Sequence, residues 1–108
     1  MKLFATLKRV REFERLQLPF LRSLIDFDII IEIGYAEEQK QPLMPKQLFL
    51  LDLGSVTTVR RRLARLVEQG VITRRTNAKD RRSDDLSIGS ASAKLLAKYG
   101  KVLAMTSV

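Results

Sequence analysis

Hydrophobic residues are spaced three or four positions apart in residues 2–17, 55–69 and 91–104, with charged or polar residues between them. This spacing places the hydrophobic side chains on one face of a helix, so it predicts three amphipathic helices. Residues 20–38 differ, because their apolar stretch is too long for a typical strand and does not alternate cleanly. They predict a helix that is buried on most of its circumference.

A helix-turn-helix is predicted in the middle of the chain. Residues 44–53 form a short predicted helix with Pro45 in its first turn, where proline is well tolerated. Gly54 stands where a glycine that ends a helix is expected, and Ser55 is a good N-cap for the next helix. That second helix is expected to end at Gly70. A short helix, a tight turn and a second helix form the helix-turn-helix arrangement.

A β-hairpin is predicted after the second helix. Residues 71–73 and 86–88 are compatible with strands, and a basic, turn-rich segment separates them. The loop is longer than a two-residue turn, so it should project from the body. Four helices, two strands and a final helix predict a mainly α fold with a small β-hairpin wing, which is a winged helix-turn-helix. With 108 residues, we expect one domain, residues 1–108.

The composition excludes several classes of function. The chain has no Cys and no His, so the usual metal ligands and the Cys–His and Ser–His catalytic pairs are missing. Asp28 and Glu32 lie one helical turn apart, but no nucleophile or glycine-rich phosphate loop accompanies them. No apolar run exceeds four residues, as in residues 48–51, which is too short to span a membrane, and the N-terminus lacks a signal-peptide pattern. We expect a cytoplasmic protein that is not an enzyme and has no cofactor, metal or membrane partner.

Positive charge is concentrated in the second half of the chain. The first 54 residues carry eight basic and eight acidic side chains, whereas the last 54 carry 12 basic and four acidic ones. Residues 60–82 alone hold nine basic side chains, and eight of them are arginine. Arginine forks onto phosphates and guanine edges, so this bias favours double-stranded DNA as the partner over a merely solvated face.

The helix 55–69 is predicted to be the recognition helix. Its hydrophobic residues cluster on one side, which should pack on the core. The opposite side can enter a major groove, and the candidates for base contacts are Thr57, Thr58, Arg61 and Arg65. Arg61 can bridge O6 and N7 of guanine, whereas Arg60, Arg62 and the helix N-terminus at Ser55 suit backbone phosphates.

The segment from Thr58 to Arg75, followed by Asp80-Arg81-Arg82 and Leu86-Ser87-Ile88, resembles the MarR family of bacterial transcription regulators. The resemblance covers roughly residues 44–100, and its most specific feature is a helix ending in Glu-Gln-Gly-Val-Ile with an Asp-Arg-Arg turn ten residues after the glycine. It implies a sequence-specific DNA-binding regulator with the wing, residues 74–86, in the minor groove. The candidate DNA-binding residues of the wing are Arg74, Arg75, Lys79, Asp80, Arg81 and Arg82.

The resemblance also implies a homodimer, in which residues 1–18 and 90–108 contribute helices to the interface. Asp80 would orient a wing arginine by a salt bridge. The chain departs from the family at Gly89, where a threonine commonly opens the last helix, at Phe49, where a small residue is common, and at Gly54, since the family's turn glycine tends to fall one position earlier.

The terminal helices are shorter than those that form a ligand cleft in the family, so a small-molecule effector is possible but unsupported. Four aromatic residues could line a small pocket, but their helical spacing favours a place in the core: Phe13, Phe20, Phe27 and Tyr35.

A second interpretation stays open from the sequence alone. Winged helices serve several purposes, so this chain could be a protein-interaction or RNA-binding module without operator specificity. The short chain and the Leu53-Gly54 turn favour that alternative. Binding to random duplex DNA, structured RNA and candidate proteins at two salt concentrations discriminates between the two.

Overall fold

The structure is a computed structural model that describes residues 2–77, 79 and 82–106, apart from the side chain of Thr106. The described residues form five helices and one two-stranded antiparallel sheet. In chain order they are α1 (Leu3–Gln17), α2 (Leu24–Glu38), α3 (Pro45–Phe49), α4 (Val56–Glu68), β1 (Ile72–Thr76), β2 (Asp84–Ile88) and α5 (Ser90–Thr106). The predicted winged helix-turn-helix is confirmed.

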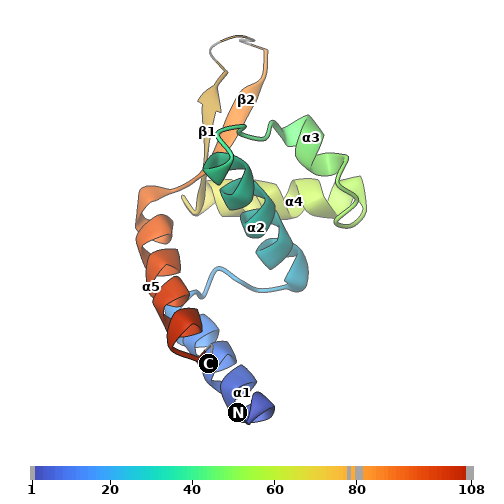
Figure 1. Cartoon of the computed structure of the whole chain (residues 1–108). Helices are drawn as coiled ribbons and strands as arrows, with labels where there is room; N and C mark the ends of the chain where they lie inside the picture. The colour runs from blue at the N-terminus through green and yellow to red at the C-terminus, as the bar shows by residue number, and fades with distance from the viewer. Residues whose placement is uncertain (1, 78, 80–81, 107–108) are drawn as a thin grey trace.

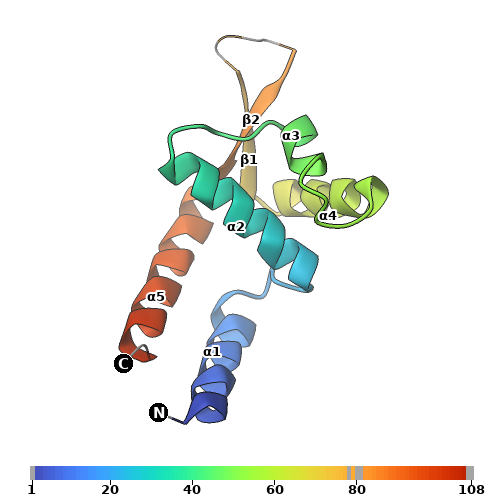
Figure 2. The same cartoon turned by 45° about the vertical axis from the view of Figure 1, so that its right-hand side comes forward.

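The molecule is elongated, with principal extents of 49 × 26 × 22 Å. The hairpin projects at one end, and α1 and α5 lie side by side at the other end, where both chain termini are found (Figure 1). Helix α2 crosses the middle of the molecule and packs on α4 and β2 (Figure 2). Helix α3 contacts α4 and β2, and α4 contacts β1, so α3 and α4 lie on one side of the molecule with the base of the hairpin.

The hydrophobic core lies where α2, α4 and the hairpin meet. Its most deeply buried side chains come from α2, α3, α4, the hairpin and the residue that follows α1. Those at or below 1% exposure are Leu18, Ile29, Ile33, Leu48, Val59, Leu66, Ile72 and Leu86. Because α4 buries Val59, Leu63 and Leu66 along one side, its orientation on the body is set by the core. The predicted buried stripe of this helix is confirmed.

Helix α2 is less buried than its sequence predicts. It places Ile29, Ile30 and Ile33 in the core, but Leu24 is 79% exposed and Tyr35 is 59% exposed. The expectation of a helix buried on most of its circumference is wrong, because one apolar side of α2 is open to solvent in the single chain.

The turn between α3 and α4 is built differently from the prediction. Helix α3 ends at Phe49, four residues before the expected end, and the left-handed residue of the turn is Asp52, with a φ of 59°. Aspartate tolerates this conformation better than most residues. Gly54 has no positive φ, so its predicted role as the helix-ending glycine is wrong. A Cβ at Gly54 would lie 3.2 Å from Cδ1 of Ile25, so glycine here lets α2 approach the turn closely.

Two glycines allow the hairpin to pack closely against the end of α4. Gly70 ends the helix with a φ of 75°, as predicted. The backbone N–H of Gly89 donates to the carbonyl of Val71 at 2.8 Å. A Cβ on Gly89 would lie only 2.1 Å from the carbonyl oxygen of Gly70, so the packing requires glycine at this position.

Candidate nucleic-acid interface

The N-terminus of α4 is capped by a side chain. The Ser55 hydroxyl accepts from the backbone N–H of Thr58 at 3.2 Å and also pairs with the Thr58 hydroxyl at 2.9 Å. Ser55 is therefore the N-cap, as predicted. Thr57 and Arg61 follow on the solvent side and are exposed, whereas Thr58 is half-buried. The helix presents a threonine and an arginine at the end that enters a groove in helix-turn-helix proteins.

Arg65 lies in a different place from the one predicted. Its guanidinium donates to Oδ2 of Asp26 at 2.8 Å and to the backbone carbonyl of Phe20 at 2.8 Å, and its side chain is only 19% exposed. The prediction that Arg65 is free to enter a major groove is wrong in this conformation. A carboxylate that is fully buried in α2 attracts it, and such a charge-assisted hydrogen bond is stronger than one between neutral groups.

Arg62 is drawn toward the same carboxylate. Its Nη1 atom lies 3.8 Å from Oδ2 of Asp26, and 30% of its side chain is exposed. Two arginines of α4 thus share one acidic partner on α2. They hold the helix against the body and contribute less to an outward positive surface than the sequence suggests.

The wing arginines do not point in one direction. Arg74 stands opposite Leu86 in the antiparallel register, and its Nε donates to Oδ2 of Asp84 at 3.1 Å. Arg75 stands opposite Asp85 and, because successive strand residues alternate, lies on the other face of the hairpin. There it lines a pocket of about 350 Å³ with Glu37. The two arginines, both candidate DNA-binding residues, therefore do not lie on one surface of the hairpin.

The tip of the wing is described in part. The backbone N–H of Lys79 donates to Oδ1 of Asn77 at 2.8 Å, and Lys79 and Arg82 are exposed. Asp80 and Arg81 lie outside the described residues. Their predicted roles, an orienting salt bridge and a DNA contact, stay predictions.

A basic groove of about 340 Å³ runs between α3, the second turn of α4 and the hairpin. It is lined by Met44, Pro45, Lys46, Phe49, Arg60, Arg74, Arg82, Ser83 and Asp84. Four of these side chains are basic and one is acidic. Arg60 is exposed, and its guanidinium carbon lies 5.2 Å from the ring centroid of Phe49.

Lys46 is the one groove cation that the sequence interpretation did not select. It belongs to the electrically neutral first half of the chain, so its charge does not stand out there. Its position in the first helix of the helix-turn-helix could have identified it, because that helix crosses the DNA backbone.

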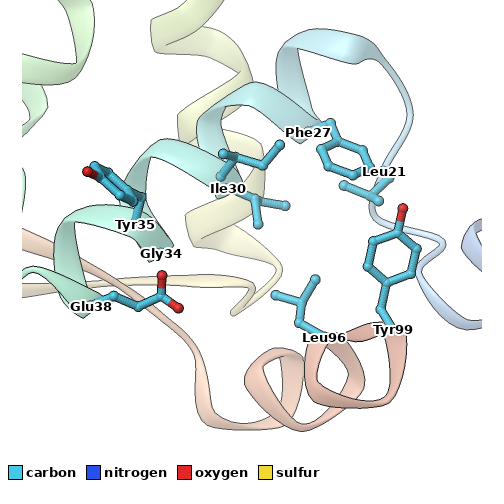
Figure 3. A pocket seen from close by; sticks show the side chains of 9 residues that line it. Leu21, Phe27, Ile30, Gly34, Tyr35, Glu38, Leu96 and Tyr99 are labelled. Carbon is cyan, nitrogen blue, oxygen red and sulfur yellow. The ribbon is translucent and has the colours of Figure 1, made fainter. Parts of the chain in front are cut away.

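A second, apolar pocket of about 320 Å³ lies between α2 and α5 (Figure 3). Phe27, Leu21 and Tyr99 border one end, and Tyr35 and Glu38 border the other. Of the four aromatic residues expected in the core, Phe20 is buried there and Phe13 packs against it. Phe27 and Tyr35 line the pocket instead, and the exposed ring of Tyr35 shows that the core expectation was wrong for it.

Tyr99 closes this pocket toward α1 through a buried polar contact. Its hydroxyl donates to Glu14 at 2.6 Å, and Arg11 donates to the other oxygen of that carboxylate at 2.7 Å. Burial, followed by the hydrogen bond and charge of Glu14, raises the pKa of the Tyr99 hydroxyl well above its usual value. Tyr99 thus stays neutral and links α5 to α1.

The described residues contain no group of three or more His, Cys, Asp or Glu side chains that could hold a metal ion. No described helix is both long enough and apolar enough to cross a membrane.

No protein-family model matches the sequence, and no curated protein sequence matches it. Solved structures match it closely in fold. MepR from S. aureus, in a complex with DNA, has a TM-score of 0.70 at 16% identity, covering 97% of this chain and 85% of that one.

Two further neighbours extend this result. The transcriptional regulator Tm0710 from Thermotoga maritima has a TM-score of 0.68 at 26% identity, covering 95% of this chain and 70% of that one. A mutant of MarR from E. coli complexed with operator DNA has a TM-score of 0.61 at 16% identity, covering 95% of this chain and 71% of that one. These neighbours are MarR-family transcription regulators, and the chain has their winged-helix fold along nearly its whole described length.

Proposed function

We propose that this protein is a sequence-specific, double-stranded DNA-binding transcription regulator of the MarR type. The observation that carries the proposal is the pairing of two features on one side of the molecule. Thr57 and Arg61 project from the N-terminal half of a capped helix, and a groove with four basic side chains lies beside it. The solved complexes of MarR and MepR with DNA, which share this fold, support the same partner.

The described residues divide into three roles in this proposal. Thr57 and Arg61 contact base edges in the major groove, where arginine suits guanine and a threonine methyl suits thymine. Arg60 and Lys46 contact backbone phosphates, which sets the register of the protein on the duplex. Arg62 and Arg65 have a structural role, because their ion pairs with Asp26 hold α4 in place.

The wing supplies a second contact in the proposal. Lys79 and Arg82 are exposed at the hairpin tip. A basic tip gains most in a narrow minor groove, where the negative potential of DNA is strongest. Arg75 faces away from α4, so we assign it no base contact.

A homodimer completes the proposal. Helices α1 and α5 expose several large apolar side chains: Leu3, Phe4, Leu7, Leu103 and Met105. Exposed apolar surface on two adjacent helices favours a partner, and a twofold dimer is the commonest choice. Two α4 helices would then read half-sites about 10 base pairs apart in a pseudo-palindrome. Light scattering should give twice the chain mass of 12.4 kDa.

The test compares duplex DNA with structured RNA at two salt concentrations, about 50 and 200 mM, using the full chain. We expect tight binding to duplex DNA that weakens steeply with salt, as it does when a protein displaces several counterions. Equal or tighter binding to RNA would instead favour the RNA-binding alternative. Loss of DNA binding at both salts, together with capture of a protein partner, would favour an interaction module.

A further inference from the structure

The contact between Phe49 and Arg60 connects the two helices of the helix-turn-helix at the edge of the basic groove. Phe49 is the last residue of α3 and packs against the hydrophobic core, so one side of its ring is held in place. Arg60 lies in the second turn of α4, with its guanidinium carbon 5.2 Å from the ring centroid. This distance lies within the range of a cation–π interaction.

The partner of Arg60 differs in kind from the partners of its neighbours. Arg62, Arg65 and Arg74 each face a carboxylate, at 3.8, 2.8 and 3.1 Å respectively. Among the described residues, no carboxylate lies within ion-pair distance of Arg60, which instead has an aromatic ring. A ring attracts the guanidinium without neutralising it. Arg60 therefore keeps its full positive charge for a ligand.

The ring also reduces the freedom of a long side chain. An arginine loses rotamer entropy when a ligand immobilises it, and a side chain that is already held loses less. A guanidinium that stacks on a ring keeps its in-plane N–H donors free at its edges. Those donors can form two parallel hydrogen bonds with the oxygens of one phosphate.

Lys46 lines the same groove from α3 and is exposed. The groove thus has an exposed lysine from α3 and an arginine from the recognition helix α4 that lies against an aromatic ring. An anionic chain that passed over the groove would meet both of them.

We propose that Phe49 is a positioning residue that holds Arg60 ready to bind a phosphate of the DNA backbone, with Lys46 as the second cation of the same clamp. The inference rests on the proposed function, because it names the chemical group that this part of the interface binds. Since phosphates carry no sequence information, the clamp increases affinity for every duplex equally.

A double-mutant cycle on the full chain tests the proposal. The variants are Phe49→Leu, Arg60→Ala and the two combined, and affinities are measured on a selected duplex and on a random duplex. Arg60→Ala should weaken binding to both duplexes by a similar factor and reduce the salt slope by about one. Phe49→Leu should weaken binding about two- to fivefold, the range for an exposed cation–π contact. In the Arg60→Ala background, Phe49→Leu should have no further effect.

A second measurement is independent of DNA. In the free protein, the side-chain NMR signals of Arg60 should show an upfield ring-current shift that Phe49→Leu removes. Lys94→Ala, which changes an exposed cation on α5, is the control for loss of one charge. It should leave the Arg60 signals unchanged and weaken DNA binding less than Arg60→Ala does.

The outcomes separate this inference from the proposed function. If the wild type binds DNA but Phe49→Leu has the same effect with and without Arg60, Phe49 acts only through folding and the positioning role is refuted. Absence of a ring-current shift would refute it as well. If the wild type binds no duplex at all, the proposed function fails and the phosphate contact fails with it.

Discussion

Replacing Asp26 with asparagine should destabilise the protein strongly, although the two side chains have almost the same shape. Asp26 is fully buried, and its Oδ2 atom accepts from Arg65 at 2.8 Å and from the backbone N–H of Arg22 at 3.0 Å. The same oxygen lies 3.8 Å from Arg62. The substitution removes the negative charge and leaves two partly buried arginines facing a neutral amide.

The expected loss of stability follows from the burial of Asp26 and of its two arginine partners. Removing one partner of a buried ion pair costs about 3–5 kcal/mol, because the remaining charge is left uncompensated. Here the arginine side chains are 19% and 30% exposed, so water can solvate them in part and the lower end of the range applies. We expect the free energy of unfolding to fall by about 3 kcal/mol, which lowers the melting temperature by roughly 10–20 °C in a domain of this size.

Urea unfolding monitored by circular dichroism measures this change. The control is Asp28→Asn, which removes an exposed carboxylate from the same helix and should change stability by less than about 0.5 kcal/mol. An Asp26→Leu, Arg65→Met double variant should recover part of the loss, because an apolar replacement of a buried pair is often tolerated. A loss below about 1 kcal/mol in Asp26→Asn would show that the ion pairs do not hold α4 on α2.

Two further predictions concern α5 and its start. The raised pKa of Tyr99 means that the unfolded chain loses the hydroxyl proton near pH 10 while the folded chain keeps it, so stability should fall as the pH rises above about 10. In thermal scans at pH 8–11, Tyr99→Phe should remove part of that fall, and an unchanged pH profile would contradict the linkage. Gly89→Ala should cost several kcal/mol or prevent folding, because its Cβ would lie 2.1 Å from the Gly70 carbonyl oxygen. Gly100→Ala is the matched control, since nothing lies within 4 Å of that Cβ, and it should stabilise α5 by about 0.5–1 kcal/mol. Equal melting temperatures for the two alanine variants would refute the steric argument.

The order of the elements could be predicted from the sequence because local signals agreed with the packing. The hydrophobic spacing in residues 55–69 matches the buried side of α4, and Ser55 and Gly70 mark its two ends. Such caps act within one helical turn, so they can be recognised without knowledge of the rest of the chain.

The directions of the arginines could not be predicted in the same way. Helical spacing places Arg65 on the solvent side of an isolated helix, but a buried carboxylate 39 positions earlier draws it inward. Arg74 and Arg75 are adjacent in a strand, so local alternation places them on opposite faces of the hairpin. The strand predicted at residues 71–73 did not include them, whereas β1 runs from Ile72 to Thr76.

The turn before α4 shows why a glycine in the sequence does not by itself identify the residue that ends a helix. Gly54 was the expected helix-ending residue because glycine adopts positive φ most easily. Asp52 adopts the positive φ instead, and Gly54 lies where a Cβ would be crowded by Ile25. A glycine in a sequence therefore indicates either a backbone need or a lack of space, and only packing distinguishes them.

The central claim is that the exposed side of α4 reads base pairs, and Arg61 tests it most directly. Duplexes bound from a random pool should be sequenced for the wild type, for Arg61→Ala and for Arg9→Ala, an exposed arginine of α1 that serves as the control. We predict a pseudo-palindrome for the wild type and for Arg9→Ala. In Arg61→Ala, base preference should relax at one position per half-site, with a loss of about 1–3 kcal/mol on the selected duplex. Identical base preferences with and without Arg61, or no preferred sequence in the wild type, would contradict the account.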